Sequence, residues 1–506
     1  MRKEREAGVG EPSSERPKPA LRLAVWLGRK TIRWSLALTL VAATILATLA
    51  VGKGLASLRL PDLKPWHRVR LTSEFVAGDL ASTATLADYL KREDRLFKEL
   101  DAKVTERLPV EDRLAMNRFY ADSPVNPVRF DPSRNWNRTY EWIPDEPVCG
   151  GVLLLHGLTD SPYTLRHLAE IYRSRGFYVL ALRLPGHGTI PAALLDVEWE
   201  DWRAAVKVGA RAVRGHSGPS LPFHIVGYSN GGALALQYAL SVLEGSGDPV
   251  PDRLVLISPM IGVSAFARLA PVVGWMGRFQ PFEKARWLDI MPEYMPFKYN
   301  SFPVRAGHES YRLTKTVQGQ IARVQKAGLL RKLPPILSFV SVVDATVSTR
   351  AVVGSLYARL PPGRGDELVA FDLNASAEMG PFIKASEHAL LAELFGNAER
   401  SYGLCVVANA RPDTREVVER SVSAGSTAIS IRPLPLAWPR QVYSLSHLAL
   451  PMAPDDPLYG LSGPVGGAAP HGEKGVLTVP MDQFMRLYSN PFFPYLREKV
   501  EATLPK

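Results

Sequence analysis

Residues 223–240, FHIVGYSNGGALALQYAL, place a serine between glycines where an apolar strand turns into a helix. Phe223–Val226 has the length and composition of a buried strand, and the small and apolar residues after the glycines suit a helix packed on a sheet. Gly227 and Gly231 flank Ser229, and a side chain at either position would crowd the tight turn. This unit predicts a fold in which helices cover a sheet.

The same alternation of strand-like and helix-like segments runs through the chain from about residue 141. WNRTYEWIPDEPVCGGVLLLHGL predicts two strands that meet at a Pro-Asp turn, the second of them fully buried. Helix-like SPYTLRHLAEIYRSRG and WEDWRAAVKVGARAV follow the strands GVLLLHG and FYVLALRLPGHG, while DRLVLISP and PPILSFVSVVD are later strands. The pattern predicts an α/β fold with a mostly parallel sheet and helices on both faces.

Ser229 is predicted to be a nucleophile. Gly-x-Ser-x-Gly between a strand and a helix forms a nucleophile elbow, a sharp turn that lifts the serine hydroxyl clear of the sheet. A helix that begins at Asn230 points unpaired backbone N–H groups and its positive dipole end toward that hydroxyl. Because glycine and serine are common residues, a purely structural turn is the alternative interpretation.

A serine nucleophile needs donors for the negative charge that develops during acyl transfer. LLLHGLTDSP places a His-Gly step directly after a buried strand, and a tight turn there leaves the backbone N–H of Leu158 free. Paired with the N–H of Asn230, it predicts an oxyanion hole. We interpret His156, and His187 in LPGHG, as structural residues of their turns rather than as bases.

The acid and the base are expected at the ends of later strands. Asp344 ends the apolar run of ILSFVSVVDATVS, where a parallel sheet delivers side chains to its active edge, and Asp372 in LVAFDLN is its competitor. His447 follows the strand-like run RQVYSLS, whereas His388 lies in a helical pattern and His471 in a glycine-rich stretch. We therefore predict that Asp344 orients His447 as the general base.

LLLHGLTDSPYTLRHLAE, ALRLPGHGT and HIVGYSNGGALALQYAL together resemble the monoacylglycerol lipase and carboxylesterase branch of the α/β-hydrolase superfamily. The resemblance is close over residues 148–260 and looser beyond them. It implies that superfamily's fold and hydrolysis of a carboxylic ester, of a lipid or another hydrophobic acyl ester. The family's catalytic serine, acid and histidine and its two backbone oxyanion donors carry over onto Ser229, Asp344, His447, Leu158 and Asn230.

The chain departs from the family in its organisation. The family usually places its histidine a few tens of residues after the acid, whereas 103 residues separate the two here. We expect a hydrolase core in two parts, 141–261 and 333–506, with an insertion at 373–440 that extends the sheet. Residues 262–332 are predicted to form a cap or lid, whose many aromatic residues either line an acyl pocket or pack the cap itself. Residues 53–140, a linker and helical extension, have no counterpart.

The N-terminus predicts a membrane anchor. Residues 1–33 carry nine Lys and Arg against four Glu, and residues 34–52, WSLALTLVAATILATLAVG, carry no charge. Nineteen residues at about 1.5 Å each span roughly the ~30 Å hydrocarbon core. The basic side stays in the cytoplasm, which places the catalytic domain on the extracytoplasmic, periplasmic-type side. A cleaved signal peptide and a buried core helix are the alternatives.

Charge and composition exclude several function classes. Of the net charge of +11, the leader supplies +5, and the remaining +6 is too dilute for a nucleic-acid surface. No HExxH, GxGxxG or GxxxxGK[ST] motif is present, so we expect no metal or cofactor. Cys149 and Cys405 form either a disulfide or two free thiols. Besides an esterase, an acyltransferase or thioesterase with the same residues and a membrane-tethered binding protein remain open.

Overall fold

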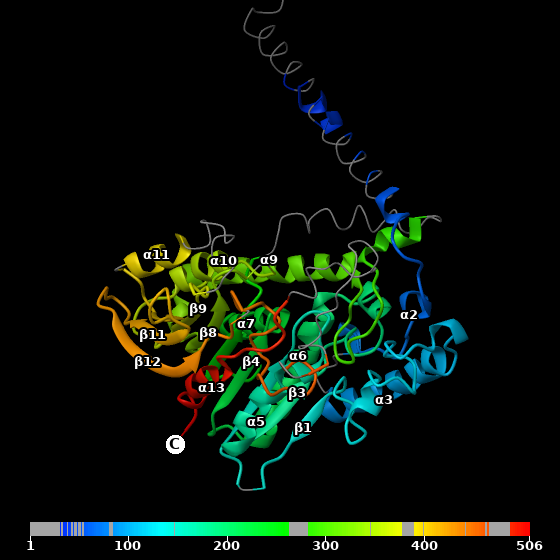
Figure 1. Ribbon diagram of the computed structural model, residues 1–506, viewed down its shortest axis with the longest axis horizontal. Helices are drawn as coiled ribbons and strands as arrows, with labels where there is room; N and C mark the ends of the chain where they lie inside the picture. Colours follow the sequence, from blue (N-terminus) through cyan, green and yellow to red (C-terminus); the bar gives the residue numbers. More distant parts are fainter. Residues whose placement is uncertain are drawn as a thin grey trace, which may run out of the picture.

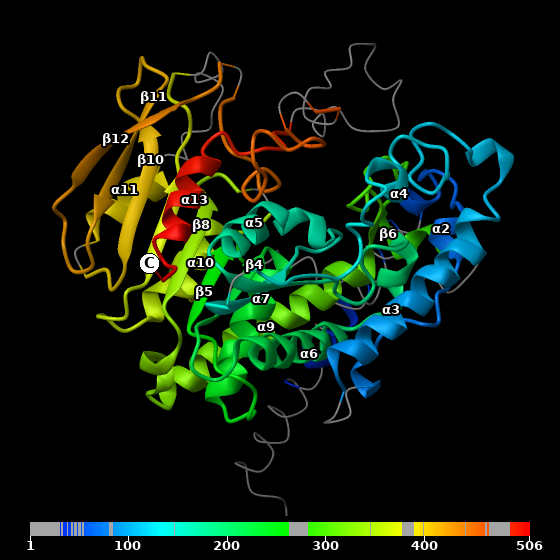
Figure 2. The same cartoon turned by 90° about the horizontal axis from the view of Figure 1, so that it is seen from below.

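The computed structural model describes residues 55–505 and scattered residues between 31 and 52. Residues outside this description within 55–505 are 80–83, 146, 263–281, 345, 377–388, 398, 441, 461–462 and 465–485. The described chain is built on a long twisted sheet with helices on both faces (Figures 1 and 2). The α/β prediction with a mostly parallel sheet is thereby confirmed.

The sheet has ten strands within the described residues, in the order β1-β3-β2-β4-β5-β8-β9-β10-β11-β12. The strands are β1 Tyr140–Trp142, β2 Gly150–Leu155, β3 Phe177–Leu182, β4 Phe223–Tyr228, β5 Arg253–Ile257, β8 Ile336–Ser341, β9 Glu367–Phe371, β10 Gly403–Asn409, β11 Glu416–Val422 and β12 Ser430–Ala437. The seven strands β3, β2, β4, β5, β8, β9 and β10 run parallel to one another. At the two edges, β1 pairs antiparallel with β3, β11 pairs antiparallel with β10, and β12 pairs antiparallel with β11. The carboxyl ends of β2, β4 and β8 therefore share one edge.

Each face of the sheet has its own hydrophobic core, because side chains alternate along a strand. On β2, Leu153 and Leu155 enter one core, and Val152 and Leu154 enter the other. The first core contains residues of α6 Trp199–Ser217, α7 Asn230–Leu243 and α9 Val304–Lys326, and the second contains residues of α5 Arg166–Ser174 and α13 Phe493–Glu501. Smaller elements are α2 Pro65–Arg68, α3 Leu86–Leu100, α4 Pro127–Phe130, β6 Trp287–Asp289, β7 Phe302–Pro303, α10 Thr349–Ser355 and α11 Ala389–Gly396.

The extension before the core packs onto it through a buried charge cluster. Arg183, which directly follows β3, binds the carboxylates of Glu74 at 2.8 Å and Glu93 at 2.9 Å. Its side chain is 1% exposed, and the hydroxyl of Tyr89 on α3 donates to its backbone oxygen. A buried arginine is tolerated only when its charge is matched, so Glu74 and Glu93 fix their parts of the extension to the core.

The stretch between β5 and β8 divides into two differently packed parts. Residues 263–281 of the predicted cap lie outside the described residues. Helix α9 belongs to the helix layer, since Leu313 and Val317 enter the same core as α6 and α7. Of the aromatic residues before it, Trp287 packs with Trp66 of the extension, and Phe297 stacks on Tyr163. The described aromatic residues thus pack against neighbouring parts of the chain, and the cap over 262–332 stays a prediction.

Residues 373–440 add strands to the sheet. β10 pairs in parallel with β9, and the β11–β12 hairpin continues the sheet to its edge (Figure 2). Cys405 on β10 is buried, with its sulfur 3.3 Å from Nζ of Lys499, and Cys149 is exposed. Both cysteines are free thiols, so the structure shows the second of the two alternatives.

Nine of the nineteen residues of the predicted anchor, 34–52, and almost all of the leader, 1–33, lie outside the described residues. A helix of the length and apolarity needed to cross a membrane is not found in the part of the chain that the structure describes. The described residues of the segment are helical, and the hydroxyls of Thr39, Thr44 and Thr48 each donate to the carbonyl four residues earlier. These residues stand clear of the body of the molecule (Figure 1).

Candidate active site

Ser229 lies between β4 and α7 in a strained backbone conformation. Its φ of 54° and ψ of −113° are unusual for a residue with a side chain. A Cβ at Gly227 would overlap the backbone of Gly231, and one at Gly231 would overlap the carbonyl oxygen of Leu155. The glycines therefore allow α7 to approach β2 and β4 closely, and the turn has the form expected of a nucleophile elbow.

The two predicted oxyanion donors are the backbone N–H groups of Asn230 and Leu158. Asn230 is the first residue of α7, and Leu158 follows the His-Gly step after β2. Among the residues that the structure describes, neither N–H donates a hydrogen bond. Free amides at a helix N-terminus and in a strained turn are the donors from which oxyanion holes are built. The structure brings both predicted donors to the edge of the sheet where the elbow lies.

His156 and His187 are held as neutral turn residues. His156 donates from Nδ1 to the oxygen of Gly157 at 2.8 Å and accepts the N–H of Leu184 on Nε2 at 3.0 Å. Burial lowers the pKa of His156 well below its usual value and that of His187 to about 4. Both nitrogens of His156 are thus used in holding the turn together, which leaves none for proton transfer.

Asp344 and His447 meet at the end of β8. Nδ1 of His447 lies 2.7 Å from Oδ2 of Asp344, and their side chains are 5% and 1% exposed. Burial raises the pKa of the Asp344 carboxyl, but the adjacent imidazole and the N–H of Val347 lower it more, so it stays below its usual value. A carboxylate on Nδ1 fixes the ring and leaves Nε2 for proton transfer.

Tyr228 connects the histidine loop to the elbow. Its hydroxyl donates to the backbone oxygen of His447 at 3.3 Å, and the two rings are 5.1 Å apart. Tyr228 directly precedes Ser229, so this contact brings the loop to the serine. Sequence reasoning missed this role, because an aromatic residue at the end of a strand has no distinguishing pattern.

Of the competing candidates, the structure describes only Asp372. Asp372 follows β9, and its Oδ1 accepts the N–H of Leu373 at 2.7 Å. His388 and His471 lie outside the described residues. The described part of the chain holds no group of His, Cys, Asp and Glu suited to a metal ion.

The profile of the alpha/beta hydrolase family matches residues 152–393, a stretch that begins within β2 and ends within α11. This part of the chain belongs to the alpha/beta hydrolase family. The hydrolase is 27% identical over 224 residues to a thermostable monoacylglycerol lipase of Bacillus sp. (strain H-257), covering 43% of this chain and 74% of that protein. It is also 27% identical over 132 residues to a carboxylesterase of Bacillus subtilis (strain 168), which covers 26% of this chain and 50% of that protein.

Two further comparisons are more partial. A monoacylglycerol lipase of Mycolicibacterium smegmatis is 28% identical over 147 residues, which is 26% of this chain and 49% of that protein. The hydrolase thus spans about half of the length of that relative. The structure of a monoacylglycerol lipase from Paleococcus ferrophilus covers 51% of this chain and 98% of its own, at 18% identity and a TM-score of 0.34.

The loop of this hydrolase that carries His447 is anchored at Asp456, a residue that sequence reasoning also missed. The Asp456 carboxylate is fully buried and accepts hydrogen bonds from Tyr163, Arg166 and His167 at 3.0, 2.9 and 2.9 Å. The N–H groups of Leu458 and Tyr459 complete its shell. All three side-chain donors come from α5 or the turn before it, so the cluster fastens the loop to the core.

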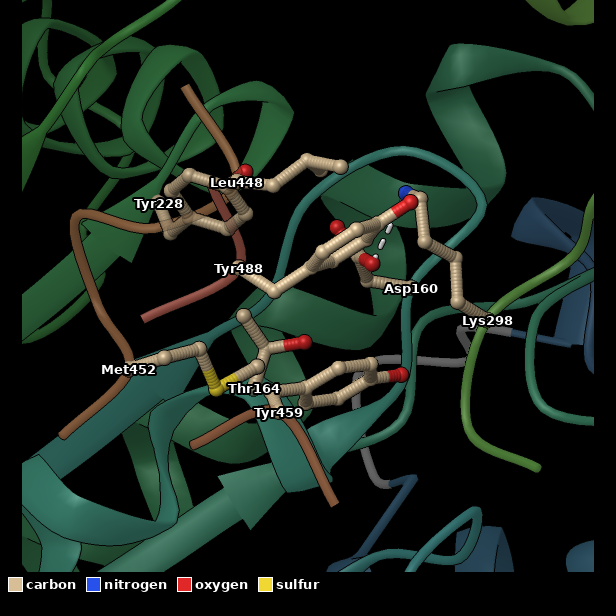
Figure 3. A pocket seen from close by; sticks show the side chains of 8 residues that line it. All are labelled: Asp160, Thr164, Tyr228, Lys298, Leu448, Met452, Tyr459 and Tyr488. Atoms are coloured by element: carbon tan, nitrogen blue, oxygen red, sulfur yellow. Dashed lines mark hydrogen bonds and ion pairs between the residues drawn. The ribbon is translucent and has the colours of Figure 1, made fainter. Parts of the chain in front are cut away.

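A small cavity of the hydrolase lies between this loop and the turn after β2. Its lining consists of Asp160, Thr164, Tyr228, Lys298, Leu448, Met452, Tyr459 and Tyr488. Figure 3 shows Lys298 and Asp160 on one side and Tyr228 and Leu448 on the other. Leu448 is the residue after His447, so the cavity adjoins both the histidine loop and the turn of Leu158.

Proposed function

We propose that this hydrolase cleaves a carboxylic ester through an acyl-enzyme on Ser229. The observation that carries the proposal is the 2.7 Å contact between His447 and Asp344, made across 103 residues of sequence next to a strained serine. A buried carboxylate on one imidazole nitrogen, with the other nitrogen open, is the arrangement that activates a hydroxyl for acyl transfer.

In the proposed mechanism, Nε2 of His447 takes the proton of the Ser229 hydroxyl while its oxygen attacks the ester carbonyl. The amides of Leu158 and Asn230 stabilise the oxyanion of the tetrahedral intermediate. His447 then donates the proton to the leaving alcohol, and the acyl-enzyme forms. A water molecule, deprotonated by the same nitrogen, then attacks the acyl group; the bond to Ser229 breaks, the imidazolium returns the proton to the serine oxygen, and the acid is released. Asp344 remains ionised and stabilises the imidazolium in both steps.

The substrate we propose is a lipid or another hydrophobic acyl ester. The support is the distant similarity to proteins named monoacylglycerol lipases. We test the reaction with p-nitrophenyl esters, for which Ser229→Ala should lower turnover by about 10⁶-fold while the protein stays folded. Ser174→Ala, at the last residue of α5, is the control and should keep full turnover. Wild-type turnover in a folded Ser229→Ala variant would refute the mechanism.

We also propose that residues 34–52 anchor the enzyme, with the catalytic domain on the extracytoplasmic side. The uncharged run after a basic leader supports this orientation. Reporter enzymes fused to the C-terminus test it. A reporter active only outside the cytoplasm should work, and activity of a cytoplasmic reporter alone would exclude the orientation.

A further inference from the structure

Lys298 joins the stretch between β5 and β8 to the turn that carries the Leu158 amide. Its Nζ donates to Oδ1 of Asp160 at 2.9 Å (Figure 3). The same nitrogen also donates to Oγ1 of Thr159 at 2.9 Å. The N–H of the next residue, Tyr299, donates to the backbone oxygen of Thr159 at 2.9 Å. Three hydrogen bonds therefore hold the two residues that directly follow the predicted oxyanion donor.

The turn needs such support because its backbone is strained. Thr159 has a φ of 66°, a left-handed conformation that β-branched residues rarely adopt. Strained residues of this kind persist only where the surroundings hold them. If Thr159 relaxed toward an ordinary conformation, the neighbouring peptide planes would swing, and the Leu158 amide would move with them.

The lysine is itself held in place. The buried guanidinium of Arg118, from the N-terminal extension, donates to the backbone oxygens of Met295 at 3.3 Å and Lys298 at 3.2 Å. The carboxylate of Glu293 accepts the N–H groups of Asn300 at 3.0 Å and Ser301 at 2.8 Å. The loop that presents Lys298 is thus fixed from both sides before any substrate arrives.

The ion pair is largely shielded from water. The side chain of Lys298 is 19% exposed and that of Asp160 is 7% exposed. Hydrogen bonds between charged groups are stronger than those between neutral groups, and burial strengthens them further. The pair therefore restrains the turn more firmly than a solvent-exposed contact would.

We propose that Lys298 is a positioning residue of the oxyanion hole. It holds the turn at Thr159 and Asp160 in the geometry that directs the Leu158 N–H at the substrate oxyanion. The assignment rests on the proposed ester hydrolysis through Ser229. It also gives the N-terminal extension a part in catalysis, because Arg118 supports the loop that carries the lysine.

The test compares Lys298→Met with Lys207→Met. Lys207 pairs with Asp248 at 2.7 Å on the surface of α6, and its side chain is 20% exposed, so the control removes a lysine of equal burial from an ion pair away from the turn. We expect Lys298→Met to lower kcat by about 10- to 100-fold with KM within about threefold, because a misplaced donor costs transition-state stabilisation. Lys207→Met should leave kcat unchanged.

A second readout separates positioning from folding. A trifluoromethyl ketone forms a hemiketal whose oxyanion occupies the hole, so Lys298→Met should bind it about 10- to 100-fold more weakly. A merely structural role would lower the melting temperature without moving this affinity. A folded Lys298→Met variant with wild-type kcat and wild-type inhibitor affinity would overturn the inference.

Two outcomes need separate treatment. If Lys298→Met does not fold, Asp160→Asn is the second variant, because it keeps the side-chain shape and removes the charge. It should lower kcat by less than the roughly 10- to 100-fold expected for Lys298→Met. An unchanged kcat in Asp160→Asn would overturn the inference. If the wild-type protein neither hydrolyses esters nor reacts with a fluorophosphonate at Ser229, the proposed function itself fails, and the role of Lys298 fails with it.

Discussion

The elbow at residues 227–232 and the loop at residues 446–459 reach the same site by opposite means. The elbow is local: two glycines and a strained serine, placed by one strand and one helix, define it. The loop has no helix or strand of its own. Asp344 and Tyr228 hold it at His447, and Tyr163, Arg166 and His167 hold it at Asp456. The elbow should therefore respond to changes in the backbone, and the loop to changes in its partners.

Among the residues that hold the elbow and the loop in place, the largest effect should come from Asp344, which orients His447. Asp344→Asn should lower kcat by about 10⁴-fold, or about 5.4 kcal/mol in the activation barrier, because the amide favours the wrong tautomer of His447. Turnover of a p-nitrophenyl ester measures it. Asp372→Asn, at the neighbouring strand end, is the matched control and should stay close to wild type; the reverse pattern would transfer the acid to Asp372.

A smaller but still severe effect should come from the elbow's backbone. Gly231→Ala places a Cβ into the carbonyl oxygen of Leu155 and should destabilise the fold by about 4 kcal/mol or prevent folding. Gly215→Ala, on α6, has open space around its Cβ and should stabilise the protein by about 1 kcal/mol. Denaturant unfolding measures both. A Gly231→Ala variant as stable as wild type would show that the elbow tolerates a side chain.

The smallest effect should be the pH dependence of the stability that His167 provides through its contact with Asp456 of the loop. Burial alone would lower the pKa of His167, but hydrogen bonds to Asp456 and Glu170 raise it above 6.5. The stabilisation that His167 provides should thus be complete below pH 6.5 and disappear as pH rises through its folded pKa. His167→Gln should therefore lower the unfolding free energy by on the order of 1 kcal/mol below pH 6.5, and by less as pH rises. Denaturant unfolding of wild type and variant at a series of pH values measures this difference.

A second buried histidine provides a control of opposite sign. Burial lowers the pKa of His224 on β4 to about 4. Wild type should therefore lose stability relative to His224→Gln as pH falls from 6.5 toward 4, because the unfolded chain binds the proton more tightly. Parallel pH profiles for His167→Gln and His224→Gln would contradict the account of both sites.

Sequence reasoning anticipated the parts of the site that depend on local pattern. The strand–turn–helix spacing around Ser229 and the alternation of strands with helices were enough to predict the elbow and the parallel sheet. Asp344 and His447 were placed only by their positions at strand ends, and the structure brings them into contact. Their catalytic roles remain predictions until variants are measured.

The rest depends on tertiary contacts that no local pattern encodes. YEW and GGVLLL were expected as two strands meeting at a Pro-Asp turn, and both form, but β1 pairs with β3 rather than with β2. The strand with which an edge strand pairs is decided by the packing of the whole sheet, and the connecting turn alone does not determine it. Lys298, Asp456 and Tyr228 were missed for a related reason, because the partners of each lie far away in the sequence or on another loop.

The most direct test of the central claim is to find the covalent adduct. The wild-type enzyme should react with a fluorophosphonate to one adduct per chain, and peptide mapping by mass spectrometry should place it on Ser229. Ser229→Ala should carry no adduct, because it lacks the nucleophile. His447→Ala should be labelled far less than wild type, because it lacks the base that activates Ser229. An adduct on another residue, or full labelling of folded Ser229→Ala, would contradict the proposed acyl-enzyme.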